Sequence, residues 1–280
     1  MKKSGLLFAF IAIVLSAAAQ DSTKILFPKK RGQFYFAWVY NRDYFSKSTL
    51  HFKNESSEPD ANVGGNQTYN FTVYDAEAHD RPGLRDIFRT DLTIPQYNYR
   101  IGYYFNDQRD LGLEINFDHV KYIMDDYQTL HVQGTIHGKP IDQDTLIDPD
   151  TFLHFEHSDG ANFLFLNLMK RQLLLHSKDN KHLLYGVVKA GGGVVIPRTD
   201  IKMFGEHINN CFHIAGYGMG IETGFRYEAF HHVYLEYTAK GAFTDYRHVL
   251  AYGAGRAYHH FWTFEQILVL GFEFGGGPKK

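Results

Sequence analysis

The stretch HVYLEYTAKGAFT, residues 232–244, alternates between two kinds of side chain along its whole length. Glu236 and Lys240 fall on one face, whereas Leu235, Tyr237 and Phe243 fall on the other. A period of two predicts a β-strand whose faces meet different surroundings. A soluble sheet would turn the apolar face toward a protein core, whereas a membrane barrel turns that face toward lipid and the polar face inward.

Seven other segments repeat this pattern, and each has about the 9–11 residues that a tilted strand needs to cross a bilayer. The eight segments are 33–41, 96–105, 111–119, 162–171, 182–195, 212–227, 232–244 and 261–274. Short polar turns (106–110, 176–181 and 229–232) alternate with longer connections (42–95, 120–161, 196–211 and 245–260). This asymmetry is typical of a barrel in the outer membrane of Gram-negative bacteria.

Charged residues gather on the polar faces of these segments. A basic side chain facing lipid at the bilayer midplane costs about 2–4 kcal/mol, so we expect the charges to face the lumen. An eight-stranded barrel is only wide enough for side chains to fill its interior. The sequence therefore predicts a plug of ion pairs. The expected network is Arg100, Glu114, Asp118, Arg171, Lys189, Glu222, Arg226, Glu236, Lys240 and Glu265, with Glu273 on the same face of its strand.

The start of the chain, MKKSGLLFAFIAIVLSAAAQ, has the basic, apolar and small-residue parts of a secretory signal peptide. We expect a signal peptide at 1–19, a periplasmic segment at 20–31, the barrel at 32–275 and a tail at 276–280. The formal net charge is −2, which gives no reason to expect a nucleic-acid partner. One cysteine, Cys211, excludes a disulfide within the chain.

The predicted fold is all-β, an eight-stranded antiparallel up-and-down transmembrane β-barrel. Alternation within 68–78 and 128–138 predicts hairpins that extend the sheet on the external side. A soluble β-sandwich is the alternative, because two packed sheets could also hold the aromatic faces.

With these strands placed, GQFYFAWVYNRDYF, IPQYNYRIGYYFND and FEHSDGANF resemble segments of an uncharacterised group of small outer-membrane β-barrel proteins of Gram-negative bacteria. The resemblance implies a location in the outer membrane, contact with the lipid bilayer and lipopolysaccharide, and the barrel assembly machinery as a partner. It implies no activity, cofactor or external ligand.

The segment HFEHSDGANF, residues 154–163, is weakly similar to the catalytic motif of lipid A deacylases. An ester hydrolase would use Ser158 as nucleophile, His154 or His157 as base and Glu156 to orient the base. His157 directly precedes Ser158, however, so the two would point to opposite faces of a regular strand. An ordinary loop-to-strand transition is the simpler interpretation.

Two further groups of residues suggest metal binding only weakly. Asp142, Asp144, Asp148 and Asp150 supply oxygen ligands without the glycine and terminal glutamate of a helical calcium loop. An exposed acidic loop is the expected alternative. The pairs His231-His232 and His259-His260 lack zinc-site spacing, and we interpret them as interfacial polar residues.

The leading functional hypothesis is non-enzymatic: a structural or surface-interaction protein that acts through 42–95 and 120–161, without a cofactor. A lipid-modifying ester hydrolase centred on 154–159 is one alternative. A narrow channel or small-ligand transporter lined by Arg100, Glu114, Asp118 and Arg226 is another.

Overall fold

The computed structural model describes residues 32–55, 68–81, 98–105, 111–157 and 159–275. Within these ranges the regular elements are β-strands paired antiparallel, which confirms the all-β prediction. The described chain has no helix with the length and apolar character of a membrane span. The predicted signal peptide at 1–19, the segment at 20–31 and the tail at 276–280 lie outside the described ranges.

Two sheets contain all the described strands. The larger sheet comprises β1 (Gln33–Phe45), β5 (Asn98–Tyr104), β6 (Leu111–Asp118), β11 (Phe163–His176), β12 (His182–Val195), β15 (Gly216–Ala229), β16 (Val233–Leu250), β17 (Arg256–Gly275), β2 (Ser48–Asn54), β3 (Tyr69–Ala76), β8 (Thr129–Ile136) and β9 (Lys139–Leu146). The smaller sheet comprises β14 (Glu206–Asn209), β13 (Asp200–Met203), β10 (Leu153–His157), β7 (Tyr122–Met124) and β4 (Ala78–His79).

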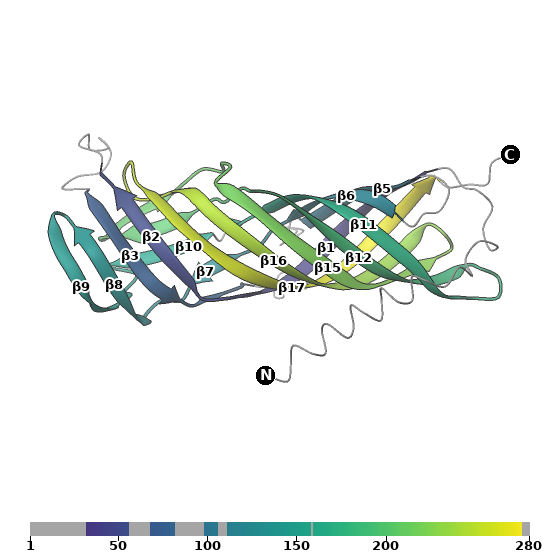
Figure 1. Ribbon diagram of the computed structural model, residues 1–280, viewed down its shortest axis with the longest axis horizontal. Coiled ribbons are helices and arrows are strands. Elements are labelled where there is room, and N and C mark those ends of the chain that lie inside the picture. Colours follow the sequence, from purple (N-terminus) through teal and green to yellow (C-terminus); the bar gives the residue numbers. More distant parts are fainter. Residues whose placement is uncertain (1–31, 56–67, 82–97, 106–110, 158, 276–280) are drawn as a thin grey trace, which may run out of the picture.

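Eight strands of the larger sheet pair in a ring. The order is β1-β5-β6-β11-β12-β15-β16-β17, and β17 also pairs with β1 from Gln33↔Gly275 to Phe45↔Thr263. Figure 1 shows these strands as long, tilted ribbons along one molecular axis. We call the end of the ring at Gln33 and Gly275 the lower end, and the end at Phe45 and Phe261 the upper end.

The register of the ring fixes its stagger. Cross-strand partners lead from Gln33 through Tyr104, Gly112, Met169, Lys189, Glu222, Lys240 and Glu265 back to β1 at Asp43. Following these partners once around the ring returns to β1 at Asp43, 10 residues above Gln33. This displacement is the shear number of the ring. Closing eight strands with such a stagger requires a strand tilt of about 35–45°.

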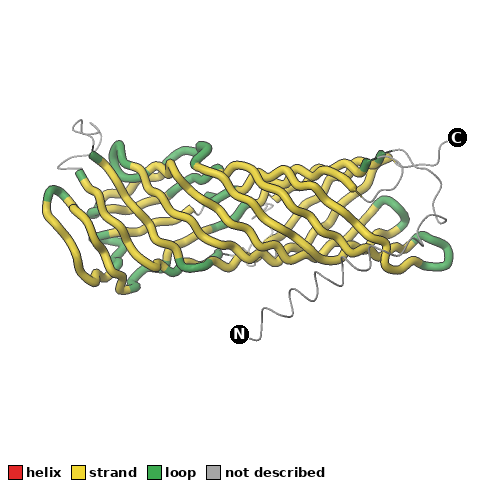
Figure 2. Tube along the Cα trace, in the orientation of Figure 1, coloured by secondary structure: helices red, strands yellow, loops and turns green. Residues whose placement is uncertain are grey.

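The strands on the upper side are longer than the alternation predicted. β16 continues to Leu250 and β17 begins at Arg256, so the expected long connection at 245–260 is wrong. The alternation continues through these residues, but polar and aromatic side chains on both faces hide it. In Figure 2 the upper end lies at the left, and most of the described chain there is strand.

The extra strands build a second compartment at the upper end, which we call the upper lobe: β2, β3, β4, β7–β10, β13, β14 and the upper ends of β16 and β17. Its two sheets enclose one apolar core in which Phe52 of β2 packs edge-on against Phe155 of β10, with ring centroids 5.5 Å apart. The strand-like pieces at 68–78 and 128–138 form β3 and β8, as the sequence predicted. The smaller sheet was not predicted, because its strands are only 2–5 residues long.

Around the ring, apolar side chains point outward and polar side chains point inward. The outward residues form a continuous belt, which is exposed in the isolated protein. Its members include Phe34, Phe36, Ile101, Leu113, Ile115, Leu166, Leu168, Ile221, Phe225, Leu235, Tyr237, Leu268, Leu270 and Phe272. The inward residues of the same strands are buried in strict alternation, as β17 shows from Ala257 to Glu273.

Glycine allows two tyrosine rings to lie flat across the inner wall. Tyr35 pairs with Gly102, and Tyr234 pairs with Gly271. A Cβ atom on Gly102 would lie 2.2 Å from the Tyr35 ring, and one on Gly271 would lie 2.1 Å from the Tyr234 ring. Each large ring therefore occupies the space that a side chain on its partner would need.

We expect Gly102→Ala to destabilise the ring by about 1–3 kcal/mol, because the new methyl group forces Tyr35 out of its place. Gly241→Ala is the matched control, since nothing lies within 4 Å of a Cβ at that outward position. Urea unfolding in micelles, followed by tryptophan fluorescence, measures both. Equal midpoints for the two variants would contradict the close packing at Gly102.

Candidate functional site

Charged side chains from all eight strands of the ring are buried on its inner face. The structure buries each of the ten residues of the expected network and gives each at least one ion pair. They converge because each lies on the inward face of its strand.

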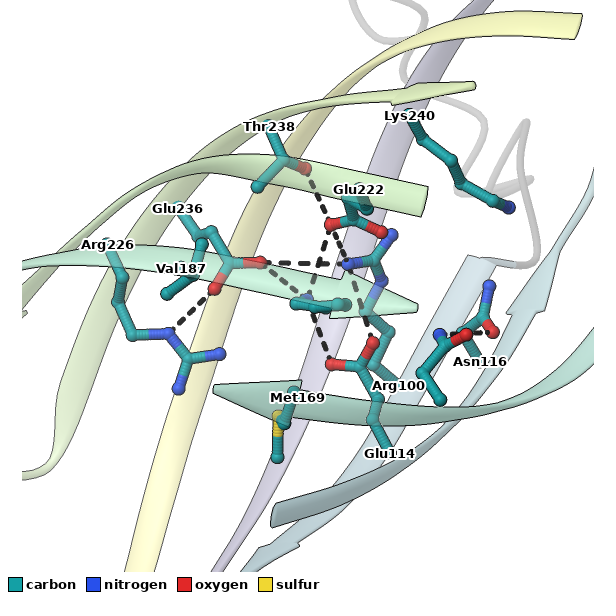
Figure 3. Close-up of polar contacts among 12 residues, drawn as sticks. Arg100, Glu114, Asn116, Met169, Val187, Glu222, Arg226, Glu236, Thr238 and Lys240 are labelled. Atoms are coloured by element: carbon teal, nitrogen blue, oxygen red, sulfur yellow. Dashed lines mark hydrogen bonds and ion pairs between the residues drawn. The ribbon is translucent and has the colours of Figure 1, made fainter. Parts of the chain in front are cut away.

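Lys189 and Arg100 form the centre of the network. Figure 3 shows Arg100 among Glu114, Glu222 and Glu236. The Lys189 Nζ lies 2.7 Å from Glu236 Oε1, 3.0 Å from Glu114 Oε2 and 3.3 Å from Glu222 Oε1. Arg100 Nη1 donates to the same Glu222 oxygen over 2.6 Å. Two cations thus share three carboxylates. Removing either cation leaves all three carboxylates with one positive neighbour fewer.

Below the centre, arginine and tyrosine side chains stack across the lumen. The Arg226 guanidinium lies 3.9 Å from the Tyr234 ring centroid and donates to Glu236 over 2.7 Å. The Arg171 guanidinium lies 3.8 Å from the Tyr104 centroid. These contacts place two guanidinium groups against tyrosine rings on the inner face of the ring.

Above the centre, Lys240 forms ion pairs with two carboxylates. Its Nζ lies 2.6 Å from Asp118 Oδ2 and 2.9 Å from Glu265 Oε1. Asp43 adds a further acid, because it is buried and faces Glu265 directly across the β1–β17 pair. Asp43 and Glu228 lie beyond the predicted ends of their strands and were not among the expected network. Both continue the alternation of their strands by one further inward position.

A second buried polar group lies in the core of the upper lobe. His157 Nε2 lies 3.2 Å from His259 Nε2. His157 Nδ1 contacts the Thr199 hydroxyl at 3.0 Å, and His259 Nδ1 contacts the Ser48 hydroxyl at 3.3 Å. The interpretation of His259 as an interfacial residue is therefore wrong, because its side chain is buried between the sheets.

Burial dominates the protonation of this histidine pair. Removal from water lowers the pKa of His157 to about 3, and it lowers the pKa of His259 well below the usual value. Rings of Tyr122, Phe155 and Tyr246 surround the pair. Burial therefore favours the neutral form of both histidines at pH 7, and a hydrogen bond between the two Nε2 atoms requires one of them to carry a proton.

Among the described residues considered for ester hydrolysis, His154 Nε2 lies 3.6 Å from Glu156 Oε2, whereas His157 lies on the other face of the strand. His154 and Glu156 lie on the outer face of β10, where His154 Nδ1 contacts Asp126 at 2.7 Å. Hydrogen bonds to Glu156 and Asp126 raise the pKa of His154. His157 points to the opposite face, into the core. Ser158 lies outside the described residues, so the hydrolase stays a hypothesis without geometric support.

The acidic segment at 141–150 is partly a strand and not the expected loop. Asp142 and Asp144 lie on β9, and each accepts a contact from one ring nitrogen of His131, at 3.1 and 3.2 Å. Asp148 accepts the backbone N–H of Asp150 in the following turn. Within the described ranges, no group of three or more potential ligand residues could hold a metal ion.

Comparisons with solved structures find similarity to outer-membrane proteins. No family model matches the sequence, and no relative is found among curated proteins. Neisserial surface protein A is 11% identical, with 86% of this chain and 97% of that chain covered and a TM-score of 0.34. The outer membrane protein OprG from Pseudomonas aeruginosa is 9% identical, with 89% and 98% covered and a TM-score of 0.35. The outer membrane protein AlkL is 8% identical, with 93% and 99% covered and a TM-score of 0.32. The chain thus resembles small outer-membrane β-barrel proteins of Gram-negative bacteria, as its sequence predicted.

Proposed function

We propose that the ring of eight strands is a transmembrane barrel that holds the upper lobe at the outer surface of the outer membrane. The apolar belt around the ring is the observation that carries this proposal. Leu166, Leu168, Leu268 and Ile221 are each at least 50% exposed in the isolated protein, although the strands that hold them are long and regular. Hydrocarbon is the surrounding that makes such a belt stable.

Membrane insertion has a direct test. We expect the protein to sediment with outer membranes, to require detergent for extraction, and to migrate differently in gel electrophoresis before and after boiling. Protein that stays in the aqueous phase without detergent would exclude the barrel and leave the soluble β-sandwich as the fold in solution.

The buried ion pairs on the inner face of the ring support a structural role for the barrel instead of transport. Arg171, Arg226 and the Tyr104 ring lie across its lower half, and Lys189 and Arg100 lie across its centre. A small solute would have to displace several paired charges at once, and each separation of buried charges is costly.

We therefore expect no steady conductance when the purified protein is inserted into a planar bilayer. A general porin inserted under the same conditions controls for insertion and current detection. A reproducible open-channel current from this protein would favour the channel hypothesis and remove the plug.

Surface interaction is the function that this architecture supports best. The upper lobe has its own aromatic core, and its outer faces are polar, as on β8 and β9. Deleting residues 129–146 removes that hairpin and leaves the eight strands of the ring intact. We expect the shortened protein to insert normally but to lose binding of its external partner in a whole-cell adhesion assay. Unchanged adhesion would exclude this hairpin as the binding surface.

A further inference from the structure

Two polar side chains interrupt the apolar belt at one place near its upper end. Arg42 of β1 and Gln266 of β17 are cross-strand partners, and both are exposed on the outward face of the ring. Their outward neighbours are Tyr44, Phe264 and Leu268. A charge on the lipid-facing wall has a cost that falls from about 2–4 kcal/mol at the midplane toward zero at the interface, so its position needs an explanation.

The height of this pair in the belt follows from the strand lengths. Arg42 lies eight residues above Phe34 on β1, and Gln266 lies eight residues above Phe274 on β17. At about 3.3 Å per residue and a tilt of roughly 40°, this distance is about 20 Å along the barrel axis. The apolar band of such barrels is about 25 Å tall, so the pair lies inside it, about 5 Å from its outer edge.

Arg42 has no ion pair with any carboxylate among the described residues. Its guanidinium lies 6.0 Å from the Tyr44 ring centroid, and the Tyr44 ring packs on Phe264 at 6.2 Å. Asp80 acts on Arg42 only at longer range. Arg247 of β16 is also exposed and lies above the belt, but it forms an ion pair. Its Nε donates a hydrogen bond to Asp245 Oδ2 over 2.8 Å.

We propose that Arg42 and Gln266 bind the phosphate of a lipid A molecule in the outer leaflet. This inference rests on the proposed location in the outer membrane. Guanidinium suits phosphate because its planar N–H groups donate to two oxygens at once. The amide of Gln266 supplies a further donor beside it, and the rings of Tyr44 and Phe264 provide a surface for the adjoining acyl chains and sugar.

The test measures binding of lipid A to the folded protein in dodecyl maltoside micelles by isothermal titration calorimetry. We expect wild type to bind lipid A with two phosphates at least about tenfold more tightly than dephosphorylated lipid A, because hydrogen bonds to charged groups contribute that much. In Arg42→Gln this preference is lost, and in Arg42→Lys it is reduced. Inorganic phosphate at the same concentrations binds neither form.

Arg247→Gln is the matched control and keeps the preference, since its side chain is already paired. Full preference in Arg42→Gln, equal loss in Arg247→Gln, or binding of inorganic phosphate as tight as that of lipid A would each overturn the site. Boiling-dependent gel mobility of every variant shows separately whether the barrel has formed, so failure of the phosphate site and failure of the barrel are distinguishable.

Discussion

Replacing Arg100 with methionine is expected to lower the free energy of unfolding by about 3–5 kcal/mol, the usual cost of removing one partner from a buried ion pair. Arg100 is fully buried and lies within 4 Å of Glu114, Asp118, Glu222 and Glu236. Methionine fills similar space but leaves these carboxylates with fewer positive neighbours. Urea unfolding in micelles, followed by tryptophan fluorescence, measures the change.

The excess of acidic residues among the described residues of the lumen increases the stability lost when Arg100 is removed. Five buried cations (Arg100, Arg171, Lys189, Arg226 and Lys240) face eight buried carboxyl groups (Asp43, Glu114, Asp118, Glu222, Glu228, Glu236, Glu265 and Glu273). Removing a cation therefore increases the imbalance, whereas neutralising an acid reduces it.

Glu265→Gln is the matched control from the same lumen. Neither Glu265 carboxylate oxygen has a well-directed hydrogen bond, and Asp43 faces Glu265 across the strand pair. We expect this variant to be neutral or slightly stabilising. Equal destabilisation by Arg100→Met and Glu265→Gln would show that packing, and not charge balance, sets the stability of the lumen.

Much of the ring could be predicted from the sequence because one physical rule governs every strand. Each spanning strand alternates between lipid and lumen, so Arg226 or Glu236 can be assigned to the lumen from its own neighbours alone. The shear of the ring could not be predicted from the alternation. It depends on which residue of one strand meets which residue of the next, and alternation repeats identically after every two residues.

The upper lobe could be predicted only in part. β3 and β8 carry alternation, but β4, β7, β13 and β14 have 2–4 residues, too few for a period to be recognised. The contact between His157 and His259 joins positions 102 residues apart. Adjacent histidines at 259 and 260 suggested an interface, whereas long-range packing of β10 against β17 puts one of them in the core.

The buried histidine pair gives the second large expected effect: acidification from pH 7 to pH 5 is expected to loosen the upper lobe. The pKa of His157 is about 3 in the folded protein, whereas an unfolded histidine has about 6.5. Below pH 6.5 the unfolded state therefore binds more protons than the folded state, and stability falls as the pH falls. The loss reaches about 2 kcal/mol for His157 at pH 5.

The geometry of the pair limits how it can respond to acid. With 3.2 Å between the two Nε2 atoms, one proton can lie between them, but two N–H groups cannot point at each other. The pair can accept a single further proton at an Nδ1 atom, where Thr199 or Ser48 would accept the hydrogen bond. A second added proton requires the two sheets of the upper lobe to separate.

Amide hydrogen exchange on β10 and β13 at pH 7 and pH 5, corrected for the intrinsic pH dependence of exchange, measures this loosening. The double variant His157→Phe/His259→Leu removes both titrating groups, so its protection should change much less between the two pH values, although it is less stable than wild type at pH 7. His207→Gln, which removes an exposed histidine paired with Asp200 at 2.6 Å, should keep the wild-type response. An undiminished acid response in the double variant would assign the effect to the carboxylates, because the histidine pair would then have no part in it.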